Sequence, residues 1–210
     1  LTPIVKSYPS KYGCVSNDLA IQVLGGAGYI RDYPVEQLYR DQRLNPIHEG
    51  TEGIHGLDLL GRKVLLNNGE SYQMFLAKVG ETIADAENLS QIAHLVPPVR
   101  AAIERTNRIT ESLLPRVVED PDSGLANATI YLDMFGQVVM AWIWLRQAVV
   151  AARTLSTSDV CPNEPEHDFY QGKVSAAQYF IRRELPQTVQ KAALLEINES
   201  TCFDMPAAYF

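Results

Sequence analysis

One long apolar stripe between residues 125 and 152 constrains the fold of this 210-residue chain more than any other feature. Its members recur every three or four positions, which is the spacing of one face of an α-helix. They are Leu125, Ala128, Leu132, Phe135, Val139, Trp142, Leu145, Val149 and Ala152. Because such a stripe is unstable in water, other helices have to pack against it.

The run from Met134 to Ala152 raises the question of a membrane span. It contains Gln137, Arg146 and Gln147, and a central arginine costs about 2.5–3.5 kcal/mol on the insertion scale. We therefore expect a buried bundle helix, no membrane span and a cytoplasmic location.

Three further stretches after residue 67 have helical spacing. They run over residues 70–94, from Pro97-Pro98 to about Pro115, and over residues 168–195 with a kink at Pro186. Turn-forming sequences separate the helices: "NNGE" at 67–70, "EDPDSG" at 119–124 and "STSDVCPNEPEHD" at 156–168. No segment alternates as a strand does. The predicted fold is all-α, and residues 67–210 are expected to form an antiparallel four-helix bundle.

The first 66 residues read as a separate group of helices. One helix is predicted over residues 3–24, ending in the glycine turn "GGAG". A second starts at Pro34 and stops before Asn45-Pro46, because the residue before a proline disfavours helix. A third begins at about Thr51. The first residues read as the interior of a longer protein.

Charge and cysteine content limit the possible functions. The chain carries 18 Lys plus Arg against 25 Asp plus Glu, and the whole excess of seven acids lies after residue 65. Such a charge argues against binding nucleic acid. Cys14, Cys161 and Cys202 are far apart, which fits reduced structural thiols better than disulfides or zinc ligands. His48 and His55 have no metal-ligand spacing either, so no metal site is expected.

Two short segments could carry chemistry, although each has a plainer interpretation when taken alone. "QVLGGAGY" at residues 22–29 follows a helix rather than a strand, so it does not fit a Rossmann fingerprint. By itself it fits a helix stop better than a glycine turn that approaches a pyrophosphate. Glu49, followed by Gly50, fits either a catalytic base or an acid placed at the positive end of a helix.

Taken together, these segments resemble the C-terminal helical domain of the acyl-CoA dehydrogenases. The shared patterns lie between Ser16 and Val64: Q-x-x-G-G-x-G-Y, then Y-P-V-E-x-L-Y-R-D, then E-G-T. The rest of the chain, through "DMPAAYF", is similar to the helical region appended in the branch that includes 3-methylmercaptopropionyl-CoA dehydrogenase. The resemblance therefore divides the chain into the end of the dehydrogenase C-terminal domain, residues 1–66, and an appended bundle, residues 67–210.

This resemblance implies roles for individual residues. Glu49 would remove the α-proton of an acyl-CoA thioester while the β-hydrogen leaves as hydride to the flavin, and Gly50 would pack along the substrate. Thr51 would contact the flavin. The segment that contacts the FAD of a neighbouring subunit would include Gln22, Gly25 and Gly26. The family commonly has x-Q after E-G-T, whereas this chain has Glu52-Gly53, so that one cofactor contact is not carried over.

The resemblance also implies FAD as the cofactor, an acyl-CoA as the substrate, electron-transfer flavoprotein as the electron acceptor and a homo-oligomer. The family builds its sites from an N-terminal helical domain, a middle β-domain and this C-terminal domain. Because the first two have no counterpart in these 210 residues, the chain by itself is expected neither to retain FAD nor to turn over substrate.

Two other functions compete with this interpretation. Residues 70–210 could be an oligomerisation or docking bundle with no direct part in catalysis. DNA-associated relatives of the dehydrogenases also carry extra helices, but these would need a basic face, which the acidic second part of the chain lacks. The identity of the acyl group cannot be read from the sequence.

Overall fold

The computed structural model describes residues 1–48, 50–157 and 164–209. Within these ranges the structure is helical and has no strand, which confirms the all-α prediction. The long helices are α1 (Thr2–Leu24), α5 (Glu70–Glu87), α6 (Val96–Glu119), α8 (Ala128–Leu155) and α9 (Pro165–Tyr179). The shorter helices are α2 (Gly26–Tyr29), α3 (Val35–Arg43), α4 (Glu52–Asp58), α7 (Pro121–Leu125), α10 (Thr188–Ile197) and α11 (Thr201–Asp204).

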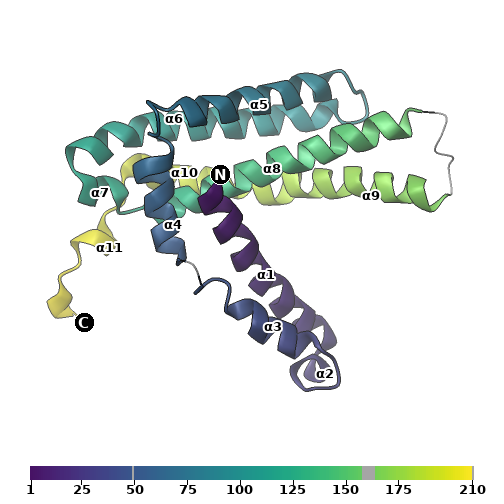
Figure 1. The fold of residues 1–210 in the computed structure, drawn as a ribbon, viewed down its shortest axis with the longest axis horizontal. Coiled ribbons are helices and arrows are strands. Elements are labelled where there is room, and N and C mark those ends of the chain that lie inside the picture. Colours follow the sequence, from purple (N-terminus) through teal and green to yellow (C-terminus); the bar gives the residue numbers. More distant parts are fainter. Residues whose placement is uncertain (49, 158–163, 210) are drawn as a thin grey trace.

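The helices form a long body with a shorter arm (Figure 1). Helices α5, α6, α8 and α9 run lengthwise through the body, whereas α1, α2 and α3 project from one side of it. Helix α8 is the common partner, because it packs against α1, α4, α5, α6, α9 and α10. The four-helix bundle predicted from the sequence stays a prediction in its details.

The apolar stripe that defined α8 is buried as expected. Every one of its members within the helix, from Ala128 to Ala152, is buried. By length and composition α8 would be long enough to cross a membrane, but 67% of its most apolar window is covered by the rest of the chain. This burial is typical of the central helix of a bundle.

Aromatic and hydroxyl side chains fix how α5 and α6 sit against α8. The ring of Phe75 meets Trp142 edge-on at 5.5 Å between centroids, and the Trp142 indole Nε1 donates to Thr82 Oγ1 at 2.9 Å. Deeper in the core, the hydroxyls of Tyr131 and Thr110 lie 2.7 Å apart. These bonds satisfy polar groups that would otherwise be costly to bury.

Several predicted boundaries were wrong. Helix α5 ends at Glu87 rather than near residue 94, because the chain turns there and buries Ile92 and Leu95 before α6 starts. Helix α6 continues through Pro115 to Glu119, and Val117 packs in the core beyond the proline.

The segment "EDPDSG", predicted as a loop, contains the short helix α7 instead. Asp120 caps it by accepting a hydrogen bond from the Ser123 N–H at 3.3 Å, and Pro121 occupies its first turn. The kink predicted at Pro186 lies within a longer interruption, residues 180–187, between α9 and α10. Residues 158–163 of the predicted loop lie outside the described residues.

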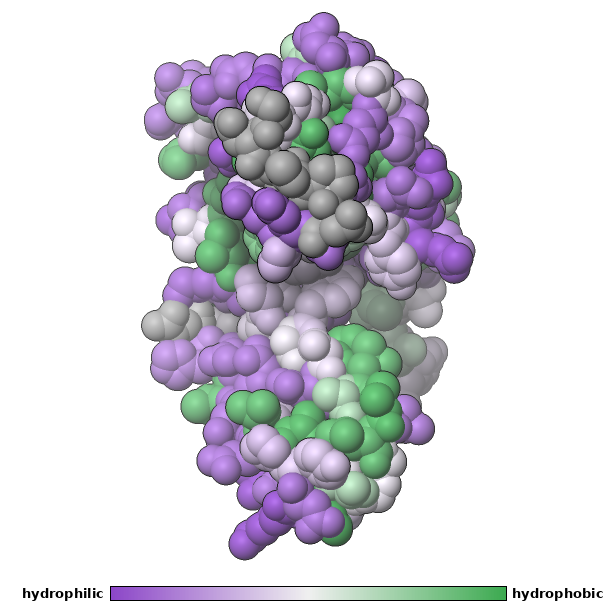
Figure 2. All heavy atoms as spheres, turned by 90° about the vertical axis from the view of Figure 1, so that its right-hand side faces the viewer, coloured by the Kyte–Doolittle hydropathy of each residue, from purple (hydrophilic) through white to green (hydrophobic). Residues whose placement is uncertain are grey.

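The first half of α1 joins the arm to the body, and α4 packs against both α1 and α8. Ile4 is buried, and a Cβ on Gly136 of α8 would come within 3.0 Å of the Tyr8 ring. Further along α1 the side chains of Val15, Leu19 and Val23 are exposed. Figure 2 shows hydrophobic residues gathered on this part of the surface. The arm therefore carries an apolar face that the described residues do not cover.

Helix α4 approaches the start of α8 so closely that only glycine fits. A Cβ on Gly56 would lie 2.7 Å from the backbone of Ala128, whereas a Cβ on Gly53 would meet nothing within 4 Å.

We expect Gly56→Ala to lower the free energy of unfolding by about 1–3 kcal/mol through overpacking. Gly53→Ala, on the same helix, should leave it equal or raise it by up to about 1 kcal/mol. Urea unfolding of both variants checks this, and equal effects would contradict the close packing.

Candidate active site

The predicted base, Glu49, lies outside the residues that the structure describes, but the residues that follow it are described. Gly50 is half-buried and has a φ of 104°. Thr51 is exposed, has an extended backbone and precedes the first turn of α4. Gly50 and Thr51 of the E-G-T segment therefore lead directly into a helix.

Gly50 needs to be glycine for two reasons. Its positive φ disfavours any side chain. A Cβ at this position would also lie 3.3 Å from Cε1 of His55, a nearly buried ring on α4. The backbone at Gly50 is thus held against an imidazole, with no side chain between them.

Gly50 lines a cavity of about 270 Å³ between α1, α4 and the segment after α3. The polar groups on its wall are of both signs. They include Lys11, Cys14, Arg43, Glu52 and His55. A cavity of this kind, next to the segment that follows the predicted base, is the candidate active-site region.

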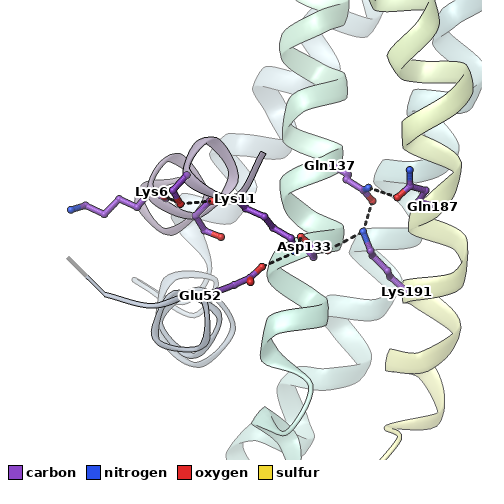
Figure 3. A network of polar contacts seen from close by, with 9 residues as sticks. Lys6, Lys11, Glu52, Asp133, Gln137, Gln187 and Lys191 are labelled. Carbon is purple, nitrogen blue, oxygen red and sulfur yellow. Dashed lines mark hydrogen bonds and ion pairs between the residues drawn. The ribbon is translucent and has the colours of Figure 1, made fainter. Parts of the chain in front are cut away.

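Lys11 is the central charge of this wall (Figure 3). Its Nζ lies 2.9 Å from Glu52 Oε1 at the start of α4 and 2.8 Å from Asp133 Oδ1 on α8. One ammonium therefore links three helices: α1, α4 and α8.

Asp133 carries the network into the body of the protein. Its second oxygen, Oδ2, lies 3.1 Å from Nζ of Lys191 on α10. Lys191 also donates to Gln137 Oε1 at 2.9 Å, and Gln137 donates to Gln187 Oε1 at 3.2 Å. Figure 3 shows this line of contacts running from Glu52 to Gln187. The candidate site is thus connected by hydrogen bonds to α8 and α10.

The pairing changes how Lys11 and Asp133 titrate. Burial acts to lower the pKa of Lys11, but its hydrogen bonds to Asp133 and Glu52 outweigh burial, so the pKa lies above the ordinary value. Burial acts to raise the pKa of Asp133, but the two lysines outweigh it, so this pKa lies below the ordinary 3.8. Both groups are held in their charged forms near neutral pH.

The predicted cofactor residues fall into two separate groups. Gln22, Gly25 and Gly26 lie at the end of α1 and the start of α2, at the tip of the arm, whereas Thr51 directly precedes α4, which lies next to the body (Figure 1). All four are exposed. A Cβ on Gly25 or Gly26 would meet nothing within 4 Å, and Gly25 has a φ of 60°. The turn thus presents open backbone that another molecule can approach closely.

A larger cavity, of about 800 Å³, lies beside this turn between α1 and α3. Tyr29, Arg31, Tyr39 and Arg43 are on its wall. Arg43 also lines the smaller cavity next to Gly50. The arm therefore combines aromatic rings and guanidinium groups near the glycine turn.

Metal-ligand clusters are absent from the part of the chain that the structure describes. His55 packs against Gly50 instead. Among the cysteines, Cys14 is half-buried, Cys202 is exposed, both are free thiols, and Cys161 lies outside the described ranges.

Sequence reasoning missed Lys11 and Asp133. A signal for Asp133 was present, because it is the only acidic residue between positions 125 and 155. A lone carboxylate within an apolar helix has to find a cation. No local pattern identified that cation, which lies 122 positions away in the sequence.

Two family models match the chain on either side of the segment 66–74. The model described as "Acyl-CoA dehydrogenase, C-terminal domain" matches residues 1–65, and "Acetyl-CoA dehydrogenase C-terminal like" matches residues 75–206. The chain belongs to the acyl-CoA dehydrogenase family.

Curated acyl-CoA dehydrogenases match nearly the whole chain. A 3-methylmercaptopropionyl-CoA dehydrogenase of Ruegeria pomeroyi is 30% identical over 88% of this chain and 31% of its own length. A broad-specificity linear acyl-CoA dehydrogenase of Mycobacterium tuberculosis is 25% identical over 100% of the chain and 35% of its own length. A butyryl-CoA dehydrogenase of Syntrophomonas wolfei is 25% identical over 99% and 34%.

These matches confirm the resemblance to the acyl-CoA dehydrogenases and to the branch with appended helices. The chain spans about a third of the length of the curated relatives it matches. The boundary at residue 66 and the roles assigned to Gln22, Gly25, Gly26, Glu49, Gly50 and Thr51 stay predictions.

The shifted pKa of Asp133 gives a prediction for stability. A carboxyl with a depressed folded pKa stabilises the fold above its unfolded pKa, and that contribution is lost as the pH falls through the folded pKa. Asp133→Asn should therefore cost roughly 1–3 kcal/mol at pH 7, and the difference from wild type should shrink below about pH 4. Urea unfolding at pH 7 and pH 3 measures this.

Asp85→Asn is the matched control, because Asp85 pairs with Arg153 at 2.7 Å but both side chains are about half exposed. Such a pair contributes about 0–1 kcal/mol. A loss for Asp133→Asn no greater than that of the control would contradict a stabilising role for the network around Asp133.

Proposed function

We propose that these 210 residues act as the C-terminal part of an FAD-dependent acyl-CoA dehydrogenase, which converts an acyl-CoA thioester to the α,β-enoyl-CoA. The observation that carries the proposal is the match of the whole chain to acyl-CoA dehydrogenases, together with Gly50 of the E-G-T segment, which lines a cavity with charged side chains on its wall. FAD, when bound, supplies the acceptor for the β-hydrogen as hydride.

In this proposal Glu49 takes the α-proton. A carboxylate can do so only if water is excluded from it and the thioester carbonyl is activated by hydrogen bonds. The first effect raises the pKa of the carboxyl and the second lowers the pKa of the α-carbon, so the gap between them narrows. Gly50, with no side chain, lets the substrate approach beside the base. Thr51 offers its hydroxyl to the flavin.

The glycine turn fits one wall of a cofactor site. Gly25 and Gly26 leave the backbone open, and the Gln22 side chain is exposed on the turn of helix before them. Because this turn between α1 and α2 lies at the opposite end of the arm from α4 (Figure 1), which Thr51 precedes, we assign it to the FAD of a neighbouring copy, in a homo-oligomer that passes electrons to electron-transfer flavoprotein.

The substrate class in the proposal is an acyl-CoA thioester. The relatives are named for 3-methylmercaptopropionyl-CoA, linear acyl-CoAs and butyryl-CoA. We assign no acyl group, because in the family the walls that set chain length come largely from regions outside these 210 residues.

The chain by itself should not retain FAD. The predicted cofactor residues are all exposed: Gln22, Gly25, Gly26 and Thr51. The chain alone would therefore contact only a small part of a bound FAD. Purified chain should show no flavin absorbance near 450 nm after mixing with FAD and desalting, and no acyl-CoA oxidation with an artificial acceptor. Retained flavin together with turnover would contradict this expectation.

The role of Glu49 is tested in the chain joined to the upstream domains of a dehydrogenase of this branch. We expect Glu49→Gln to lower kcat by more than tenfold on an acyl-CoA panel, while flavin content stays equal. A loss below tenfold, which is about 1.4 kcal/mol of barrier, would rule out Glu49 as the base. Glu87→Gln, on the exposed end of α5, is the matched control and should retain full activity.

A further inference from the structure

The start of α4 is tied to the appended helices by one bridge of charges. Glu52, three residues after the predicted base, accepts a hydrogen bond from Lys11, and Lys11 donates a second one to Asp133. Glu52 and Lys11 lie within residues 1–65, whereas Asp133 and Lys191 lie within residues 75–206. The bridge therefore crosses between the two regions that the family models match.

The bridge is balanced in charge. Two lysines, Lys11 and Lys191, face two carboxylates, Glu52 and Asp133, and only Asp133 contacts both lysines. The side chains of Asp133 and Lys191 are each 19% exposed, so this half of the bridge is largely shielded from solvent. Without the charge of Asp133, Lys191 would have no carboxylate partner in the bridge and Lys11 would keep only Glu52.

Glu52 carries the charged contact of the first turn of α4. Thr51 makes no side-chain cap on the helix. The close packing of Gly56 on Ala128 fixes the second half of α4, one turn further on. At the beginning of the helix, the carboxylate of Glu52 contacts Lys11, the buried ring of His55 packs against the Gly50 backbone, and the His55 N–H donates to the Thr51 carbonyl at 3.1 Å.

We propose that Asp133, in the appended bundle, is a positioning residue for the dehydrogenation: it holds Lys11 in place, and through Lys11 and Glu52 it fixes the start of α4 next to the predicted base. The inference rests on the proposed function. It gives the appended helices a part in catalysis. A small displacement of a catalytic group from its productive position lowers the chemical rate more than it weakens substrate binding.

The experiment measures kcat and KM of the flavin-loaded enzyme, with the chain joined to the upstream domains, normalised to bound flavin. Asp133→Asn keeps the shape of the side chain and removes its charge, and it should lower kcat roughly tenfold with KM changed less than about threefold. Asp133→Glu keeps the charge and should recover most of the rate. Asp85→Asn, the same substitution in the exposed pair with Arg153, should match wild type.

A second variant tests the bridge where folding is little affected. Glu52→Gln cuts only the last link and leaves Asp133 on both lysines. Because the Glu52 side chain is 41% exposed, the Glu52→Gln variant should unfold at a thermal midpoint close to that of wild type. Its kcat should fall as it does for Asp133→Asn.

The outcomes separate the two proposals. If Glu49→Gln abolishes activity but Asp133→Asn and Glu52→Gln keep the kcat of Asp85→Asn, the positioning role is wrong and the proposed function stands. A fall in activity carried by KM alone, or one that Asp133→Glu does not recover, would also overturn it. If Glu49→Gln itself retains activity, the proposed function fails.

Discussion

A largely shielded carboxylate in the central apolar helix is the constraint on which the arrangement of the other helices depends. Asp133 sits on α8, whose remaining buried surface is almost entirely apolar. An unpaired charge there would cost several kcal/mol, so cations have to reach it. Lys11 of α1 and Lys191 of α10 do so from opposite ends of the chain. Meeting this one requirement places the arm, the first turn of α4 and the C-terminal helices around α8.

Local sequence patterns predicted which segments are helical, whereas contacts between distant residues determine where some of the helices end. The period of the stripe on α8 was enough to predict its buried face, because each member has to avoid water wherever the helix packs. The end of α5 was misplaced because Ile92 and Leu95 continue the apolar content through a turn. Helix α7 was missed although the sequence held its cap, Asp120, and Pro121.

The candidate site was predictable only in part. The motif around Glu49 and the glycine turn could be identified because the family pattern is local, within about fifty residues. Lys11 could not be paired with Asp133, since nothing in the sequence fixes which residues of α1 face α8. Val15, Leu19 and Val23 are exposed on the apolar face of α1. In the proposed function, upstream domains or a neighbouring copy would pack against this face.

The coupling free energy between Lys11 and Asp133 measures how strongly this pair joins α1 to α8. A double-mutant cycle with Lys11→Met and Asp133→Asn, followed by urea unfolding at pH 7, isolates the contribution of the pair. We expect a favourable coupling within about 0.5–3 kcal/mol. If the two substitutions were additive to within about 0.3 kcal/mol, the pair would not hold the arm to the bundle, and the central place given to Asp133 would be wrong.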